Sequence, residues 1–308
     1  MENLNETTAH VVEVVSDMKD IPAGAVNIRE NGVSAFHKDS DHVKIVKKTD
    51  KPGIDIYVDA ESKNEIVHIP VVVSKPGLED KVYNDFYIAD GASCYIVAGC
   101  GLHNDSEHIT RHDGIHTFHI GKNAKVSYIE KHYGEGTGTG AKILNPVTNV
   151  YLGEGSNLTM DMIQIEGVDS TVRDTFVEME ADSKMTVTEK LMTHDNQKAE
   201  SNMEIKLKGD GATARIISRS VAKDKSLQIF HPKAIGDAKC HAHVQCDSII
   251  MGDAVVSSIP EITASNVDAQ LIHEAAIGRI NNDQLIKLRT FGMNEEEAEA
   301  VIIENFLK

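Results

Sequence analysis

The chain has 308 residues, 41% of them hydrophobic, and a formal net charge of −17 at pH 7. A field of that sign repels nucleic acid and anionic membranes, so we expect neither as a partner. No basic and apolar leader opens the sequence and no apolar run reaches about 18 residues, so we expect a cytoplasmic chain. Aromatic residues make up 5% and Trp is absent, which favours narrow stacked strands over a wide aromatic sandwich.

The first 82 residues are expected to form a cap made of one helix and short strands. An apolar stripe predicts the helix over residues 3–19, and Pro22 ends it. Residues 21–32 predict a loop. Runs rich in β-branched residues, separated by Pro-Gly turns, predict strands at 43–46, 54–58 and 66–73. No residue of this segment points to chemistry.

A weak internal repeat predicts a β-helix core over residues 83–270. Each unit has a Gly, Asp or Asn turn, a small residue, and then alternating apolar positions. The small residues are Ala92, Ala124, Ser156, Ser183, Ala212, Ala238 and Ala254. Their separations of 32, 32, 27, 29, 26 and 16 residues are typical of a solenoid of stacked β coils with loops of variable length. A large β-sandwich is the alternative, but it needs more aromatic core and more hairpin turns.

Residues 271–308 are expected to be mainly helical. Asn281 to Asp283 start one helix, and Gly292 ends it. Asn294 caps a second helix, and Glu297 completes a capping box. The apolar stripe of this second helix is predicted to be Ala298, Val301, Ile302 and Phe306. The helices either cover the open end of the coil, where strand edges lack partners, or dock a partner protein; the two roles are compatible.

The four cysteines lie at positions 94, 100, 240 and 246, and no CxxC pair occurs. Zinc-ribbon and thioredoxin motifs are therefore excluded. In a cytoplasmic chain, dispersed cysteines are free thiols or cluster ligands more often than disulfides, although any one of them can be an inert core residue. A regular strand over 240–246 would place alternate residues on one face, and the inner set would be Cys240, Ala242, Val244 and Cys246.

A second group of candidate ligands follows Cys100. Five histidines lie close behind it, at positions 103, 108, 112, 116 and 119. Their spacing matches no standard zinc motif. We take His103, His112 and His116 as candidate metal ligands, and a surface loop with occasional metal binding is the alternative.

A third group is the pair His273 and Glu274. Neighbours on a straight strand point to opposite faces, so the two cannot face one ligand unless the backbone bends. A packed His beside a solvated Glu is the alternative. Together with Cys246 the pair offers thiolate, imidazole and carboxylate, the ligand types that iron and sulfide chemistry needs.

The run Gln245-Cys246-Asp247, an aliphatic segment ending at Gly252, and LIHEAAIGRI at 271–280 resemble the SufB/SufD family of SUF iron–sulfur cluster assembly scaffolds. The resemblance runs from about Tyr83 to the C-terminus. It implies a right-handed parallel β-helix, and a C-terminal end that docks SufC, an ABC-type ATPase.

The same resemblance implies roles for individual residues. Cys246 matches the cluster-building cysteine of SufB, Glu274 the functional Glu of SufB, and His273 the functional His of SufD. Cys100 matches a cysteine that receives sulfur and passes it through the β-helix. A chain that carries all of these suits a homodimer formed through its last strands. It departs from many SufB proteins at 130–133, where Glu-Lys-His-Tyr stands in place of a Gln-Asn-Trp run.

We therefore expect a non-enzymatic scaffold. It would take sulfur from a sulfur donor protein, build a transient iron–sulfur cluster at the last coils, and work with a SufC-like ATPase. One alternative is a β-helix carbohydrate lyase or hydrolase, which needs converging carboxylates and sugar-stacking aromatics that are scattered here. Another is a metal-binding structural protein that uses the His-rich segment.

Overall fold

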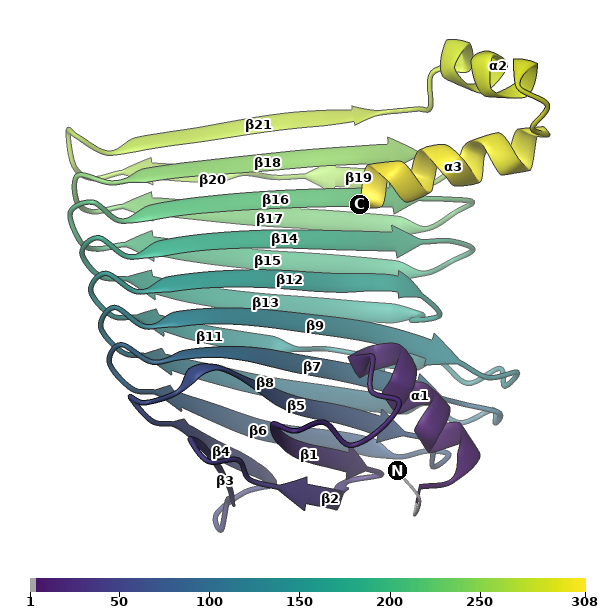
Figure 1. Ribbon diagram of the computed structural model, residues 1–308. Coiled ribbons are helices and arrows are strands. Elements are labelled where there is room, and N and C mark those ends of the chain that lie inside the picture. Colours follow the sequence, from purple (N-terminus) through teal and green to yellow (C-terminus); the bar gives the residue numbers. More distant parts are fainter. Residues whose placement is uncertain (1–3) are drawn as a thin grey trace.

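Two long sheets face each other along the whole molecule (Figure 1). The computed structural model describes residues 4–308, of which 57% is strand and 11% helix, wound into a β-solenoid of about 8 turns. Each coil gives one strand to each sheet, and strands of successive coils pair in parallel. The predicted β-helix is confirmed, and its right-handed sense stays a prediction.

The two sheets are called sheet A and sheet B. In spatial order, sheet A holds β2 (Val33–Lys38), β1 (Ala25–Glu30), β5 (Lys63–Val73), β7 (Ser93–His103), β9 (Lys125–Glu135), β12 (Asn157–Glu166), β14 (Lys184–Thr193), β16 (Thr213–Ala222), β18 (His241–Ile250) and β21 (Gln270–Gly278). Sheet B holds β3 (Val43–Lys47), β4 (Gly53–Val58), β6 (Glu79–Ile88), β8 (Thr110–Ile120), β10 (Lys142–Leu144) with β11 (Val147–Leu152), β13 (Ser170–Met179), β15 (Lys198–Leu207), β17 (Leu227–Gly236), and β19 (Val255–Ser258) with β20 (Glu261–Ala264).

The N-terminal end of the stack is closed by antiparallel strands. The predicted strands at 43–46, 54–58 and 66–73 are confirmed as β3, β4 and β5. The predicted loop at 21–32 is wrong, because β1 occupies its second half. Asn31 and Gly32, both at positive φ, turn β1 into the antiparallel β2. Strands of the coils therefore begin before residue 83 and continue after residue 270. The division into 1–82, 83–270 and 271–308 stays a prediction.

The predicted repeat is confirmed for its first five small residues. The residues that follow them pair directly from coil to coil, and all five are fully buried. The last two assignments are wrong. His241 pairs with Thr213, so Cys240 and not Ala238 stacks on Ala212. Ala254 precedes β19, in the other sheet. A thiol fills the place of a methyl group, and that exchange of residue type hid the repeat.

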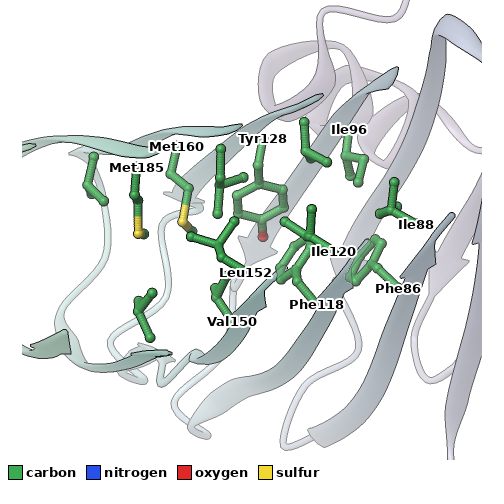
Figure 2. Packing of buried hydrophobic residues seen from close by; sticks show 14 of the residues in the cluster. Phe86, Ile88, Ile96, Phe118, Ile120, Tyr128, Val150, Leu152, Met160 and Met185 are labelled. Carbon is green, nitrogen blue, oxygen red and sulfur yellow. The ribbon is translucent and has the colours of Figure 1, made fainter. Parts of the chain in front are cut away.

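Along each coil the interior has an apolar half and a polar half. Phe86 and Phe118 stack at 4.2 Å in the apolar half, and Tyr128 packs edge-on against Phe118 (Figure 2). Smaller residues such as Val150 and Met185 continue this half toward the C-terminal coils. The polar half is lined by buried His112, His116, Glu130, His132, Arg173, Glu189, Ser201 and Ser218.

Helix α1 (Glu6–Ser16) lies across the outer face of sheet A and contacts β5, β7 and β9 (Figure 1). It is shorter than the predicted 3–19, and residue 3 lies outside the described residues. Two glycines of β7 let it approach. A Cβ at Gly101 would lie 2.0 Å from Val11 Cγ1, and one at Gly99 would lie 2.3 Å from the Val15 carbonyl oxygen.

The tail forms α2 (Asn282–Thr290) and α3 (Glu295–Leu307), with the predicted capping box of Asn294 and Glu297. The predicted stripe on α3 is wrong in part. The helix buries Ala298, Ile303 and Leu307, and the last two pack against Val221 of β16. Phe306 is confirmed in part, because it also packs against this cluster, whereas Val301 and Ile302 line a groove between α3 and α2. Within residues 4–308 no helix is long and apolar enough to cross a membrane.

Candidate functional site

Cys246 and His273 meet inside the last coil. They come from neighbouring strands, β18 and β21, whose register pairs Val244 with His273. Cys246 points inward, as the alternation of 240–246 predicts, and is 3% exposed. Its Sγ lies 3.3 Å from His273 Nε2. A thiol and an imidazole that bind one tetrahedral metal ion are about 3.6 Å apart, so this pair is spaced for a shared metal.

Glu274 lies on the opposite face of β21. The strand pairs with β18 without a register shift, so His273 and Glu274 point to opposite sides of the sheet. Glu274 Oε2 lies 3.3 Å from His243 Nε2 on the outer surface. Sequence reasoning did not assign His243 a role, although its outward position follows from the same alternation. The structure therefore brings Cys246 and His273 together and leaves Glu274 outside.

Both groups of the inner pair are neutral at neutral pH. Burial raises the pKa of the Cys246 thiol to about 11. Burial, and then the nearby His243, lower the pKa of His273 below its ordinary value. The contact between Sγ and Nε2 therefore joins two neutral groups. A metal ion that binds the Cys246 thiolate must displace the thiol proton, which couples binding to pH.

The pair lies at an open edge of the solenoid. β21 is the last strand of sheet A, and β19 and β20 end sheet B (Figure 1). In the described chain no further strand pairs with these edges. Exposed apolar side chains lie on or next to them: Val255, Ile259, Ile262, Val267, Ile272 and Ile277. Unpaired edges of this kind favour pairing with another chain.

Cys100 is sealed inside a coil near the other end. It is 4% exposed, and α1 covers the outer face of its strand between Gly99 and Gly101. Burial, and then the Glu130 carboxylate, raise the pKa of this thiol well above its ordinary value. The thiol is therefore protonated and closed to solvent in this conformation.

Buried polar groups connect the coil of Cys100 with that of Cys246. Arg173 forms an ion pair with Glu130, and its Nη2 donates to His132 Nδ1 at 3.1 Å. Burial alone would raise the pKa of Glu130, but the charge of Arg173 holds it well below its ordinary value. Further along, Glu189 accepts hydrogen bonds from Ser201 at 2.8 Å and Ser218 at 3.2 Å. Glu189, Ser218 and Cys246 then line one small cavity of about 20 Å³.

This polar row explains the unusual run at 130–133. Glu130 and His132 point inward to Arg173, whereas Lys131 points outward to Asp17 of α1. Sequence reasoning missed Arg173. The available signal was an Arg at an inward position of an alternating strand, where a charge needs a buried partner.

Comparisons with known proteins agree with this geometry. The family model described as SUF system FeS cluster assembly, SufBD core domain, matches residues 170–306. An iron–sulfur cluster assembly SufBD family protein of Archaeoglobus fulgidus is 25% identical over 278 residues, covering 89% of this chain and 73% of that protein. One of Methanocaldococcus jannaschii is 32% identical over 193 residues, covering 61% of this chain and 60% of that protein.

The chain belongs to the SufB/SufD family. Membership places it in iron–sulfur cluster assembly. A chloroplastic SufBD protein of Arabidopsis thaliana is 27% identical over 206 residues but is matched over only 37% of its length. The chain thus spans between about a third and three quarters of these three relatives. The matched core of the family contains Cys246, His273 and Glu274, whereas Cys100 and the His-rich segment precede it.

In this SufB/SufD chain the three candidate metal ligands of the His-rich segment are divided. His103 lies at the surface, 2.8 Å from Glu135 Oε1 and 2.9 Å from Asp105 Oδ2. His112 and His116 are buried on β8. Among the described residues, no group with ligand atoms within 4.8 Å of one another includes all three. The structure does not bring the three histidines together, because strand alternation turns two rings inward and leaves the third at the surface. Their role as metal ligands stays a prediction.

The group that does meet this spacing is His194 with Asp195 and Asp224, within the part of the chain that the structure describes. It is half-buried to exposed and lies on turns between strands. His194 Nδ1 lies 2.7 Å from Asp195 Oδ2. Sequence reasoning did not find this group, and its contacts are accounted for by the turns themselves.

Proposed function

We propose that the chain is a non-enzymatic scaffold on which an iron–sulfur cluster forms at the last coil. The observation that supports this most is the 3.3 Å separation of Cys246 Sγ and His273 Nε2 beside unpaired strand edges. The two atoms offer the thiolate and imidazole that iron accepts in clusters. A site at an edge can be completed by ligands from a second chain.

We propose a homodimer as the source of those ligands. Two copies that meet edge to edge through β21 would bring two Cys246–His273 pairs toward one axis. Glu274, on the outer face, would then belong to the rim of the shared site. In such a dimer Cys246, His273 and Glu274 could all lie near one cluster, although in a single chain Glu274 points to the opposite face.

Sulfur delivery is proposed to begin at Cys100, with a sulfur donor protein as the source. The buried polar row from Glu130 to Glu189 is the part of the interior that could accompany sulfur between the two cysteines. Cys100 is closed in this conformation, so delivery requires an opening of the N-terminal coils or of α1. The row has Glu130 and His132 where many SufB proteins have Gln and Trp.

A SufC-like ATPase is the proposed partner of the tail. The groove between α2 and α3 has a volume of about 590 Å³ and is lined by Leu288, Phe291, Val301, Ile302 and Phe306, among others. Phe291 is 73% exposed, which is unusual unless the surface binds another protein. ATP hydrolysis in the partner would shift the population of the scaffold toward a state in which Cys246 is accessible.

Anaerobic reconstitution tests the cluster site. The purified chain is mixed with Fe²⁺ and sulfide, and charge-transfer absorbance is recorded. We expect Cys246→Ser to abolish the absorbance and His273→Ala to reduce it. Cys240→Ser is the matched control, because Cys240 is buried in the same coil, six residues before Cys246 and opposite Ala269 and Gln270 rather than His273. Full absorbance in Cys246→Ser would contradict the assignment.

The carbohydrate alternative gains no support from the surface. A groove of about 910 Å³ on sheet B contains exposed Tyr57 and Tyr151. The rings stack on one another through Tyr87 and His119, with centroids 5.0 to 5.4 Å apart and planes within 12°. Neighbouring rings therefore cover both faces of Tyr87 and His119 and one face of Tyr57 and Tyr151, which leaves little open ring face for a sugar to stack on.

A further inference from the structure

His112 carries a nitrogen that finds no partner inside the coil. The residue is 2% exposed, and its Nδ1 lies 3.0 Å from Asp80 Oδ2. Burial alone would raise the pKa of Asp80, but hydrogen bonds from Arg29 and His112 hold it well below its ordinary value. The carboxylate is an acceptor, so His112 donates through Nδ1. In the neutral ring the lone pair is then on Nε2, and no described residue forms a hydrogen bond with that atom.

His116 points inward from the same strand, two inward positions after His112. Its Nδ1 is held by a tyrosine in place of a carboxylate. Tyr128 donates its hydroxyl to Glu130 Oε1 at 3.1 Å, and its oxygen lies 2.7 Å from His116 Nδ1. His116 therefore donates through Nδ1 and also keeps its lone pair on Nε2. Its other neighbour is the Asn84 amide, 3.4 Å from Nε2.

The two Nε2 atoms lie close to one point in space. A Cβ at Gly114, between the two histidines, would lie 3.3 Å from His116 Nε2 and 3.4 Å from His112 Nε2. Glycine thus keeps open the space that any other side chain would take. An imidazole that donates its second nitrogen to a carboxylate is the arrangement that orients histidine as a metal ligand. Imidazole nitrogen suits Fe²⁺, Co²⁺ and Zn²⁺.

A cavity lies near the pair at the N-terminal end of the stack. It has a volume of about 730 Å³ and is lined by residues that include Asn27, Arg29 and Asn84. Asn84 borders this cavity and also contacts His116. Entry of a cation from this side requires the Asn84 side chain to move, and its amide oxygen is a further ligand once the amide turns.

We propose that His112 and His116 together bind one divalent transition-metal cation, such as Fe²⁺, inside the coil. The site is separate from the Cys246–His273 pair and does not depend on the proposed scaffold function. It lies in the coils that hold Cys100, because the charges of Asp80 and Glu130 act on that thiol as well. A cation held here would favour the thiolate form of Cys100.

The test is an anaerobic titration of the full chain with Co²⁺ alone, followed by its visible absorbance and by equilibrium dialysis. Cys246→Ser/His273→Ala is the background, so that the cluster site is silent. We expect one equivalent to bind. Gly114→Ala should weaken binding at least tenfold, because its methyl group fills the site while both imidazoles remain. His112→Ala should weaken it as much.

His119→Ala is the matched control, since this ring lies on the outer face of the same strand. It should bind as the background does, and thermal melting of each variant verifies that it is folded. Equal binding by a folded Gly114→Ala variant, or no binding by the background at all, would overturn the proposal. Failure of cluster reconstitution with Co²⁺ binding intact would count against the scaffold function only.

Discussion

The two ends of the solenoid treat a buried cysteine differently. Around Cys100 the interior holds aliphatic side chains and, close by, the paired charges of Arg173 and Glu130, and α1 covers the strand from outside. Around Cys246 the interior is lined by several serines together with Glu189, Gln228 and Phe230, and the next strand edge has no partner in the described chain. The first environment shields the thiol from solvent. The second places the thiol beside an unpaired strand edge, where another chain could contact it. One repeated coil can therefore hold two chemical roles, because inward side chains change while the backbone repeats.

The largest effect should come from breaking the charge row of the N-terminal coils. Arg173→Ala leaves Glu130 buried without its cation, which should cost about 3–5 kcal/mol of unfolding free energy. Urea denaturation measures the loss. Arg215→Ala, an exposed residue on sheet A, should change stability by less than about 0.5 kcal/mol. Equal losses in the two variants would show that the row does not stabilise the fold.

Acid should weaken the N-terminal coils before the last one. His116 has a folded pKa of about 4, below the unfolded value of about 6.5, so its contribution is present above pH 6.5 and is lost as pH falls toward 4. The loss should reach about 3 kcal/mol. Urea unfolding at pH 7 and pH 4 measures it. A His116→Gln variant should lose less over the same range, and an identical loss would assign the effect to other groups.

Alkaline pH should instead destabilise the C-terminal end of the solenoid, at Cys246. Cys246 has a folded pKa of about 11, above the unfolded thiol value of about 8.5, so its contribution is present below pH 8.5 and is lost as pH rises to 11. Reaction with iodoacetamide, followed by mass spectrometry, should accelerate about tenfold per pH unit in this window. Cys100, more deeply buried, should react more slowly at every pH. Faster labelling of Cys100 would reverse the comparison.

A smaller effect is expected where α1 meets β7. Gly101→Ala places a methyl group 2.0 Å from Val11 Cγ1, so the helix must move, at a cost of about 1–3 kcal/mol. Hydrogen exchange over residues 6–16 should speed up. Gly278→Ala on β21, where a Cβ meets nothing within 4 Å, is the control and should leave exchange unchanged.

The smallest effect should come from the outer face of the last coil. His243→Ala removes the contact with exposed Glu274, and pairs of this kind contribute about 0–1 kcal/mol. Thermal denaturation should show little change. A large loss would mean that Glu274 already has a structural role in the single chain.

Much of the fold could be predicted because strand alternation is a local property. The inward set from Cys240 to Cys246 and the caps Asn281 and Asn294 follow from neighbours in sequence. The strand β1 was missed because half of its residues, Asn27, Arg29 and Glu30, are polar and find partners only after folding. Asn27 accepts a hydrogen bond from Ser34, and Arg29 donates to Asp80, 51 residues away.

The candidate site divides in the same way. Alternation alone indicates that His273 and Glu274 point apart, and the structure agrees. The 3.3 Å contact of His273 with Cys246 depends on the register of two strands separated by 27 residues, which variable loops make unpredictable from the sequence alone. The convergence of His112 and His116 depends on Gly114 between them and on carboxylates from two other strands.

The antiparallel strands at the N-terminal end limit what the molecule can assemble into. β2 and β3 run antiparallel to their neighbours, whereas a further coil would add parallel strands. Lys44 and Lys47 on the edge strand β3 also disfavour pairing with another chain. Addition of a further parallel coil at this end is therefore disfavoured. In the proposed homodimer, both copies would use their β21 edges on each other, which would leave no such edge for a third copy.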